Sequence, residues 1–163
     1  MPHTLIVLVE DKPGVLNRVA SLFRRRAFNI ESLTVGRTSD PGVSRMTIVV
    51  DSDSSNAARV AAYLARLVNV LHVEDVSESP TIARDLALVK VKASAARESL
   101  LRIVDETRAH IVDSADQTVT VEITGEPPHV DAVIDRLSPL GVVEMVRTGR
   151  VAMRRGDVSR VPL

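Results

Sequence analysis

The order of predicted strands and helices is the feature that most constrains this chain, because the same order occurs twice. In the first half, apolar runs and alternating patterns predict strands at residues 4–9, 29–37, 45–50 and 70–76. Two segments with apolar side chains at helical spacing begin at about residues 14 and 54. The order is therefore strand, helix, strand, strand, helix, strand.

The second half repeats this order after a short polar break at residues 77–80. Strands are predicted at residues 86–91, 110–113, 117–124 and 142–146, with helices at 96–109 and from 127. This is the split arrangement of ferredoxin-like folds. We therefore predict an α+β protein with two ferredoxin-like βαββαβ domains in tandem, at residues 1–77 and 81–156, and a flexible tail at 157–163.

Each predicted helix has a single apolar stripe, so the helices should cover one face of a four-stranded antiparallel sheet. The predicted stripes are Leu16, Val19, Ala20, Phe23 and Ala27; Ala57, Val60, Ala61, Leu64 and Val68; Leu100, Leu101 and Val104; and Val130, Val133, Ile134 and Leu137. The basic stretch at residues 150–160 is expected to fray.

The composition argues against several classes of partner. The 163 residues include 21 basic and 21 acidic side chains, so no net charge attracts nucleic acid or a membrane surface. Aromatic residues make up only 2% of the chain, which leaves few platforms for stacking bases or flat cofactors. Because the sequence shows no leader and no membrane-spanning run, we expect a cytoplasmic protein.

No catalytic constellation or metal-ligand spacing is evident in the sequence. The chain has no cysteine, and its four histidines lie far apart at His3, His72, His110 and His129. Asp51 and Asp53 follow a strand and are better explained as helix caps than as a carboxylate pair. We therefore expect no catalytic residue, no bound metal and no cofactor on this chain.

The turn Asp11-Lys12-Pro13-Gly14 is the strongest candidate for a binding site. Gly14 lets the backbone come close to a ligand, and N–H groups at a helix start point outward toward a carboxylate. The amide of Asn29 can both donate and accept hydrogen bonds. Together these groups suit the carboxylate and ammonium of a free amino acid, although an ordinary structural turn explains the same residues.

The segment Asp11-Lys12-Pro13-Gly14-Val15-Leu16, followed by Asn29-Ile30, resembles the ACT domain, a ferredoxin-like module that binds amino acids. Residues 29–36 and 44–50 extend the likeness to the small regulatory subunits of acetolactate synthase. The likeness continues at residues 88–91, 144–149 and 155–156, and thus covers nearly the whole chain.

This resemblance implies a non-catalytic subunit that activates a large catalytic subunit and confers feedback inhibition by a branched-chain amino acid, namely valine. Thiamine diphosphate, magnesium and FAD are then expected on the catalytic partner. In the family the ligand lies between two ACT domains of a homodimer, and the matching positions here are Asp11, Gly14, Val15, Leu16, Asn29 and Ile30. Asp11 stands where relatives carry asparagine.

The second predicted strand is consistent with such a dimer. In ferredoxin-like order it lies at a sheet edge, yet residues 30–36 carry only one charge, at Glu31. An edge of this kind invites pairing with another chain. The alternative interpretation is a free-standing amino-acid sensor that acts on another partner.

Overall fold

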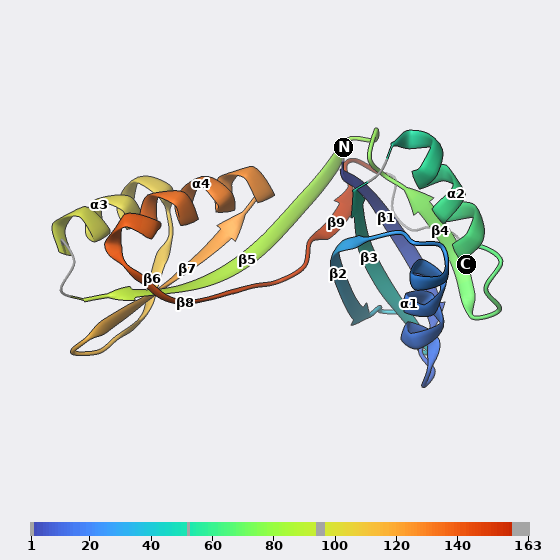
Figure 1. Ribbon diagram of the computed structural model, residues 1–163, viewed down its shortest axis with the longest axis horizontal. Coiled ribbons are helices and arrows are strands. Elements are labelled where there is room, and N and C mark those ends of the chain that lie inside the picture. Colours follow the sequence, from blue (N-terminus) through green and yellow to red (C-terminus); the bar gives the residue numbers. More distant parts are fainter. Residues whose placement is uncertain (1, 52, 94–96, 158–163) are drawn as a thin grey trace. The chain divides into compact units, whose positions relative to one another are not determined.

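The computed structural model describes residues 2–51, 53–93 and 97–157, which form two units (Figure 1). The second unit is the stretch 83–149, and the first combines the residues before it with those from Arg150 on. The sequence placed residues 150–156 in the second domain, whereas in the structure they belong to the first. Most of the expected tail at 157–163 lies outside the described residues.

The first unit has the predicted order of strands and helices. Its elements are β1 (Pro2–Glu10), α1 (Val15–Arg25), β2 (Ile30–Arg37), β3 (Val43–Asp51), α2 (Ser54–Leu64) and β4 (Val70–Asp75). The strands form one antiparallel sheet in the order β2-β3-β1-β4. β1 is therefore central, which explains its apolar sequence, and β2 lies at an edge as predicted.

Both helices of the first unit pack on one face of this sheet, where they bury an aliphatic core. The core comprises Leu5, Val7, Val9, Val15, Val19, Leu22, Phe23, Met46, Ile48, Val50, Val60 and Leu64. The predicted stripe of α1 was partly wrong, because Leu16 and Ala20 are exposed while Val15 and Leu22 are buried. Val68 is also exposed, since α2 ends at Leu64 and a turn follows.

The other face of the first sheet carries a short strand from the C-terminal segment, β9 (Val151–Arg154), which also pairs with β5. The Arg150 N–H donates to Ser32 Oγ at 2.8 Å, and its guanidinium donates to Thr4 Oγ1 at 3.2 Å. Ser32 and Thr4 both pair with Val49, so they lie on the same face of the sheet. The expected fraying of this stretch was therefore wrong for residues 150–154.

Two further contacts hold β9 in place. Arg45 on β3 donates to the carbonyl of Ala152 at 2.6 Å, and Arg154 pairs with Glu74 on β4 at 2.8 Å. Ala152 is buried. β9 thus acts as a strap across the face that the helices leave uncovered.

The second unit repeats the arrangement. Its elements are β5 (Thr81–Lys92), α3 (Arg97–Thr107), β6 (His110–Ser114), β7 (Thr118–Gly125), α4 (Pro127–Leu137), a 3-10 turn (Ser138–Leu140) and β8 (Val142–Arg147). The strand order β6-β7-β5-β8 matches that of the first sheet. The α+β class with two βαββαβ units is therefore confirmed. The predicted start of α3 at Ala96 lies outside the described residues, and Leu101 is exposed whereas Ile103 is buried.

A buried carboxylate ties the ends of the second sheet together. Asp85 at the start of this unit is 7% exposed and accepts from Arg147 Nη2 at 2.6 Å. Arg147 also pairs with Asp131 on α4. Arg147 therefore links β5, β8 and α4. Because a buried charge without a partner is costly, loss of Arg147 would destabilise this unit.

Candidate functional site

The turn between β1 and α1 holds the first part of the predicted site. Gly14 is the N-cap residue of α1, with φ 85° and ψ −8°. This is the left-handed region, which glycine adopts without strain. A Cβ built on Gly14 would meet no atom within 4 Å. Glycine is therefore needed here for its backbone angles, and the space beside it is open.

The start of α1 offers hydrogen-bond donors that the described residues do not use. No side chain caps the helix, and the Val15 N–H reaches the Lys12 carbonyl at 3.4 Å. Within the described ranges, the N–H groups of Gly14, Leu16 and Asn17 have no acceptor. Because these donors lie at the positive end of the helix dipole, they favour an anionic ligand.

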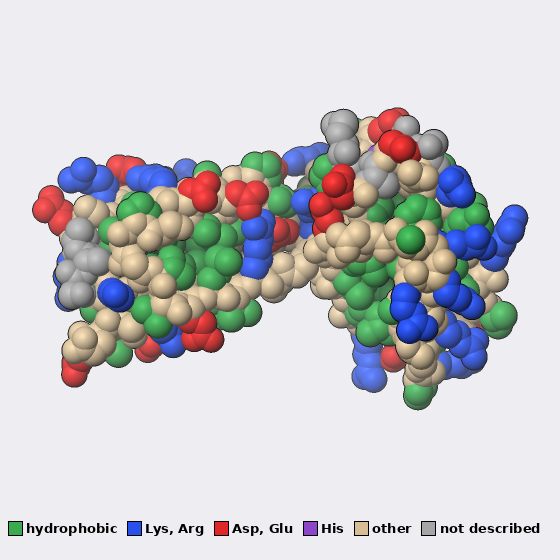
Figure 2. Space-filling model, viewed as in Figure 1, with side chains coloured by type: hydrophobic (Ala, Val, Ile, Leu, Met, Phe, Trp, Pro, Cys, Tyr) green, Lys and Arg blue, Asp and Glu red, His purple; other side chains and the backbone are tan. Residues whose placement is uncertain are grey.

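Basic side chains surround this helix. Figure 2 shows Lys and Arg side chains gathered around α1. The exposed arginines of the helix are Arg18, Arg24 and Arg25, and the exposed Arg26 follows directly as its C-cap residue. Arg24 and Arg25 lie in its last turn, where cations complement the negative end of the dipole. Arg24, Arg25 and Arg26 thus lie at the end of α1 opposite Gly14, whereas the turn before Gly14 carries Glu10 and Asp11.

The preceding residues brace the turn. The Glu10 carboxylate accepts from Asn69 Nδ2 at 2.5 Å and from Lys12 Nζ at 3.2 Å. The hydrogen bond from Asn69, followed by that from Lys12, lowers the pKa of Glu10 from its ordinary value. Asn69 in turn accepts from Arg18 on α1 at 2.8 Å. These contacts fix the start of the helix relative to β1 and β4.

Asp11 connects the turn to the end of β2. Its N–H donates to the Gly42 carbonyl at 2.8 Å, and its carboxylate pairs with Arg37 Nε at 3.0 Å. Arg37 is the last residue of β2. The predicted site residue Asp11 thus holds the helix start close to the C-terminal end of the edge strand.

The two aliphatic residues at the helix start face different environments. Val15 is 5% exposed and packs in the core, so only its backbone is available to a ligand. The Leu16 side chain is 45% exposed. Leu16 is therefore the apolar side chain that a ligand at the helix start can contact.

Asn29 and Ile30 lie at the opposite end of the sheet. Ile30 pairs with Val50, near the end of β3. The turn before Gly14 follows Glu10, which pairs with Val43 at the start of β3. At about 3.3 Å per residue these two positions are roughly 23 Å apart. The structure brings Asp11, Gly14, Val15 and Leu16 together, and a single chain does not bring Asn29 and Ile30 to them.

The residues that brace the site were not predicted from the sequence. Glu10 and Asn69 are 59 residues apart, and only the register of β1 with β4 brings them together. Arg37 offers a weak signal, since this charged residue ends a stretch of the edge strand, residues 32–36, that carries no charge. Within the described ranges, no group of three or more His, Asp or Glu side chains is placed to hold a metal ion, and no helix could cross a membrane.

Known proteins resemble this chain over nearly its whole length. Residues 5–72 match a family described as an AHAS small subunit-like ACT domain, and residues 84–156 match the small subunit of acetolactate synthase. The acetolactate synthase small subunit of Mycolicibacterium smegmatis is 44% identical over 155 residues, which cover 94% of this chain and 91% of that protein. That of Aquifex aeolicus is 43% identical over 155 residues, covering 94% and 81%. The crystal structure of the Thermotoga maritima acetolactate synthase small subunit has a TM-score of 0.89 at 37% identity, covering 97% of this chain and 99% of that one.

Proposed function

The chain belongs to the family of acetolactate synthase small subunits, and from this premise we propose that it activates the large catalytic subunit and confers feedback inhibition by valine. As a regulatory ACT-domain protein, it has the large subunit as its partner. In this proposal thiamine diphosphate, magnesium and FAD lie on that partner. This chain contributes no catalytic residue and carries the regulatory signal.

The observation that carries the proposal is the uncapped start of α1. The N–H groups of Gly14, Leu16 and Asn17, which lack acceptors in the described part of the chain, can donate to the valine carboxylate. The exposed Leu16 side chain can contact the isopropyl group. Asn29 can accept a hydrogen bond from the ammonium group through its amide oxygen.

A second copy of the chain supplies Asn29 in this proposal. Antiparallel pairing of β2 with β2 of the second copy sets the start of one strand beside the end of the other. The end of β2 is close to the helix start, because Arg37 pairs with Asp11. Asn29 and Ile30 of the second copy then approach Gly14 of the first. The site is therefore complete only in the homodimer.

The exposed edge of β2 supports this mode of pairing. Among the residues that the structure describes, β2 pairs with β3 alone, which leaves the backbone groups on its other side without a strand partner there. Val35 is 43% exposed, and Leu33 is half-buried. In a dimer with a twofold axis, the free N–H and C=O groups of β2 in one copy would hydrogen-bond to those of β2 in the other.

A mixed dimer of two variants tests the composite site. Gly14→Asp blocks the helix start and Asn29→Ala removes the polar side chain, so each homodimer should bind valine poorly. The two variants are co-expressed with different tags, and the mixed dimer is purified through both tags. Because each proposed site combines Gly14 of one copy with Asn29 of the other, one site of the mixed dimer carries both changes and the other carries neither. Calorimetric titration should then show valine binding at half the wild-type stoichiometry.

The same preparations test the other parts of the proposal. If the mixed dimer binds no valine, Gly14 and Asn29 do not act across two copies. If both homodimers bind valine like the wild type, the site is not at the start of α1. All preparations should stimulate the large subunit, and a wild-type chain that fails to do so would favour a free-standing sensor.

A further inference from the structure

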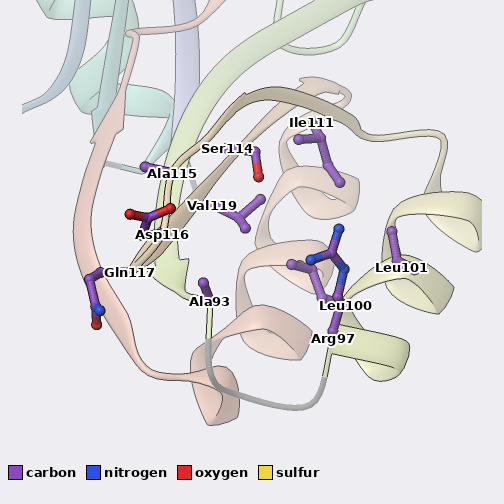
Figure 3. Close-up of a pocket in the computed structure, with 10 residues that line it drawn as sticks. All are labelled: Ala93, Arg97, Leu100, Leu101, Ile111, Ser114, Ala115, Asp116, Gln117 and Val119. Carbon is purple, nitrogen blue, oxygen red and sulfur yellow. The ribbon is translucent and has the colours of Figure 1, made fainter.

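The second unit contains a pocket that the proposed function does not use. It lies between α3 and the β6–β7 hairpin and has a volume of about 520 Å³ (Figure 3). Pockets of about 300–1,000 Å³ are typical of small-molecule sites. The pocket shares no residue with the start of α1, since all its lining residues belong to the second unit.

One part of the lining is aliphatic and anchored in the core. Leu100 of α3 is 2% exposed and belongs to the core of the second unit, against which the half-buried Val119 packs. Ile111 of β6 is 40% exposed, because it lies on an edge strand. These side chains offer an apolar surface for a short aliphatic group.

The polar part of the lining has opposite charges on two walls. Figure 3 shows Arg97 on α3, across the pocket from Asp116 and Gln117 on the hairpin. In the ranges that the structure describes, neither Arg97 nor Asp116 makes an ion pair or a side-chain hydrogen bond. Their charges are thus available to a ligand that lies between them.

The hairpin wall is held in position by backbone hydrogen bonds. The Ala93 N–H donates to the Gln117 carbonyl at 2.9 Å, and the Ala115 N–H donates to the Thr118 carbonyl at 2.9 Å. The first bond joins the end of β5 to the hairpin, and the second closes its turn. The position of Asp116 is therefore set by the sheet.

We propose that this pocket is a second amino-acid site, which binds an aliphatic zwitterion. The carboxylate of the ligand pairs with Arg97, and its ammonium pairs with Asp116 and the Gln117 amide oxygen. The aliphatic side chain lies against Leu100, Ile111 and Val119. A ligand with only one of the two charges leaves one wall unpaired, so both charges are needed for full affinity.

The test uses the full-length chain with labelled Ile, Leu and Val methyl groups and L-leucine as the probe. Leucine should shift the methyl resonances of Ile111 and Val119 in a saturable manner. Two analogues separate the charges, because 4-methylpentanoate lacks the ammonium and 3-methylbutylamine lacks the carboxylate. Each should bind about tenfold more weakly than leucine, as expected for the loss of one charge-assisted hydrogen bond at a partly exposed site.

Matched variants assign the effect to the pocket. Arg97→Gln and Asp116→Asn should each weaken leucine binding about tenfold. Arg102→Gln on α3 and Asp113→Asn on β6 are controls, because neither residue lines the pocket. Gly14→Asp should leave the Ile111 response unchanged, which separates this site from the one at α1. The proposal is overturned if leucine leaves both methyl groups unmoved, or if Arg97→Gln and Asp116→Asn bind leucine like the controls.

Discussion

Replacing Gly14 with aspartate should weaken valine binding by about two to three orders of magnitude. The added side chain displaces the ligand carboxylate from the helix start and removes one charge-assisted hydrogen bond, which costs about 1.5–3 kcal/mol. A second negative charge about 4 Å away in a solvated site adds about 1 kcal/mol of repulsion. Together these effects correspond to about a 70- to 900-fold loss of affinity.

The same substitution strains the backbone, and a second glycine provides the control. Gly14 has φ 85° and Gly156 has φ 82°, and a Cβ on either would meet nothing within 4 Å. Gly156→Asp therefore introduces the same charge and a similar strain, of at most about 1–2 kcal/mol, without touching the helix start. Any difference between the variants in valine response reflects the position of the charge.

The assay is a valine titration of the reconstituted holoenzyme, with each small-subunit variant at a saturating concentration. Gly14→Asp should still stimulate the large subunit but should show no inhibition at valine concentrations that inhibit the wild type. Gly156→Asp should follow the wild-type curve. If Gly14→Asp shows the wild-type inhibition curve, the argument from the helix start is refuted.

Three further variants test the rest of the structure. Leu33→Lys on the β2 edge should yield a monomer in sedimentation experiments, and a variant that remains dimeric would place the interface elsewhere. Arg147→Ala should lower the free energy of unfolding by about 2–4 kcal/mol in urea titrations, because it leaves the buried Asp85 unpaired; a loss below about 1 kcal/mol would contradict this. Asn69→Ala should raise the pKa of Glu10 toward its ordinary value in an NMR titration. A carboxylate whose pKa is lowered in the folded state adds stability that is lost as the pH falls through that pKa. The variant should therefore lose less stability than the wild type on acidification. An unchanged Glu10 pKa would refute the role given to the Asn69 hydrogen bond.

The sequence predicted the strands, helices and strand order well, because these depend on local periodicity. The apolar run of β1 fits its central place in the sheet. Of the two expected helix caps, Asp53 caps α2 through its carboxylate, whereas Asp51 is the last residue of β3. Exact helix faces were less predictable. Leu16 and Leu101 fit an apolar stripe but are exposed, because a shift of one residue turns a side chain by about 100° around the helix axis.

Long-range relations could not be read from periodicity. The sequence of β9 gave no sign that it would lie on the first sheet, since its contacts with Ser32 and Thr4 depend on tertiary packing. The sequence likewise did not predict that Asn29 and Gly14 lie at opposite ends of one sheet, because that depends on the register of the strands. Family resemblance identified these residues, and the register of the strands shows that one chain holds them at opposite ends of its sheet.

The strap formed by β9 also bears on how the chain folds during synthesis. Residues 2–82 of the first unit leave the ribosome before the second unit, yet the last strand of the first unit follows the entire second unit in sequence. At about 5–20 residues per second, translation of the intervening unit takes roughly 3–13 s. Throughout that interval the nascent first sheet lacks the segment that contacts Thr4, Ser32 and Glu74. A chaperone that binds nascent chains would meet this face during that interval and lose access to it once residue 154 has emerged.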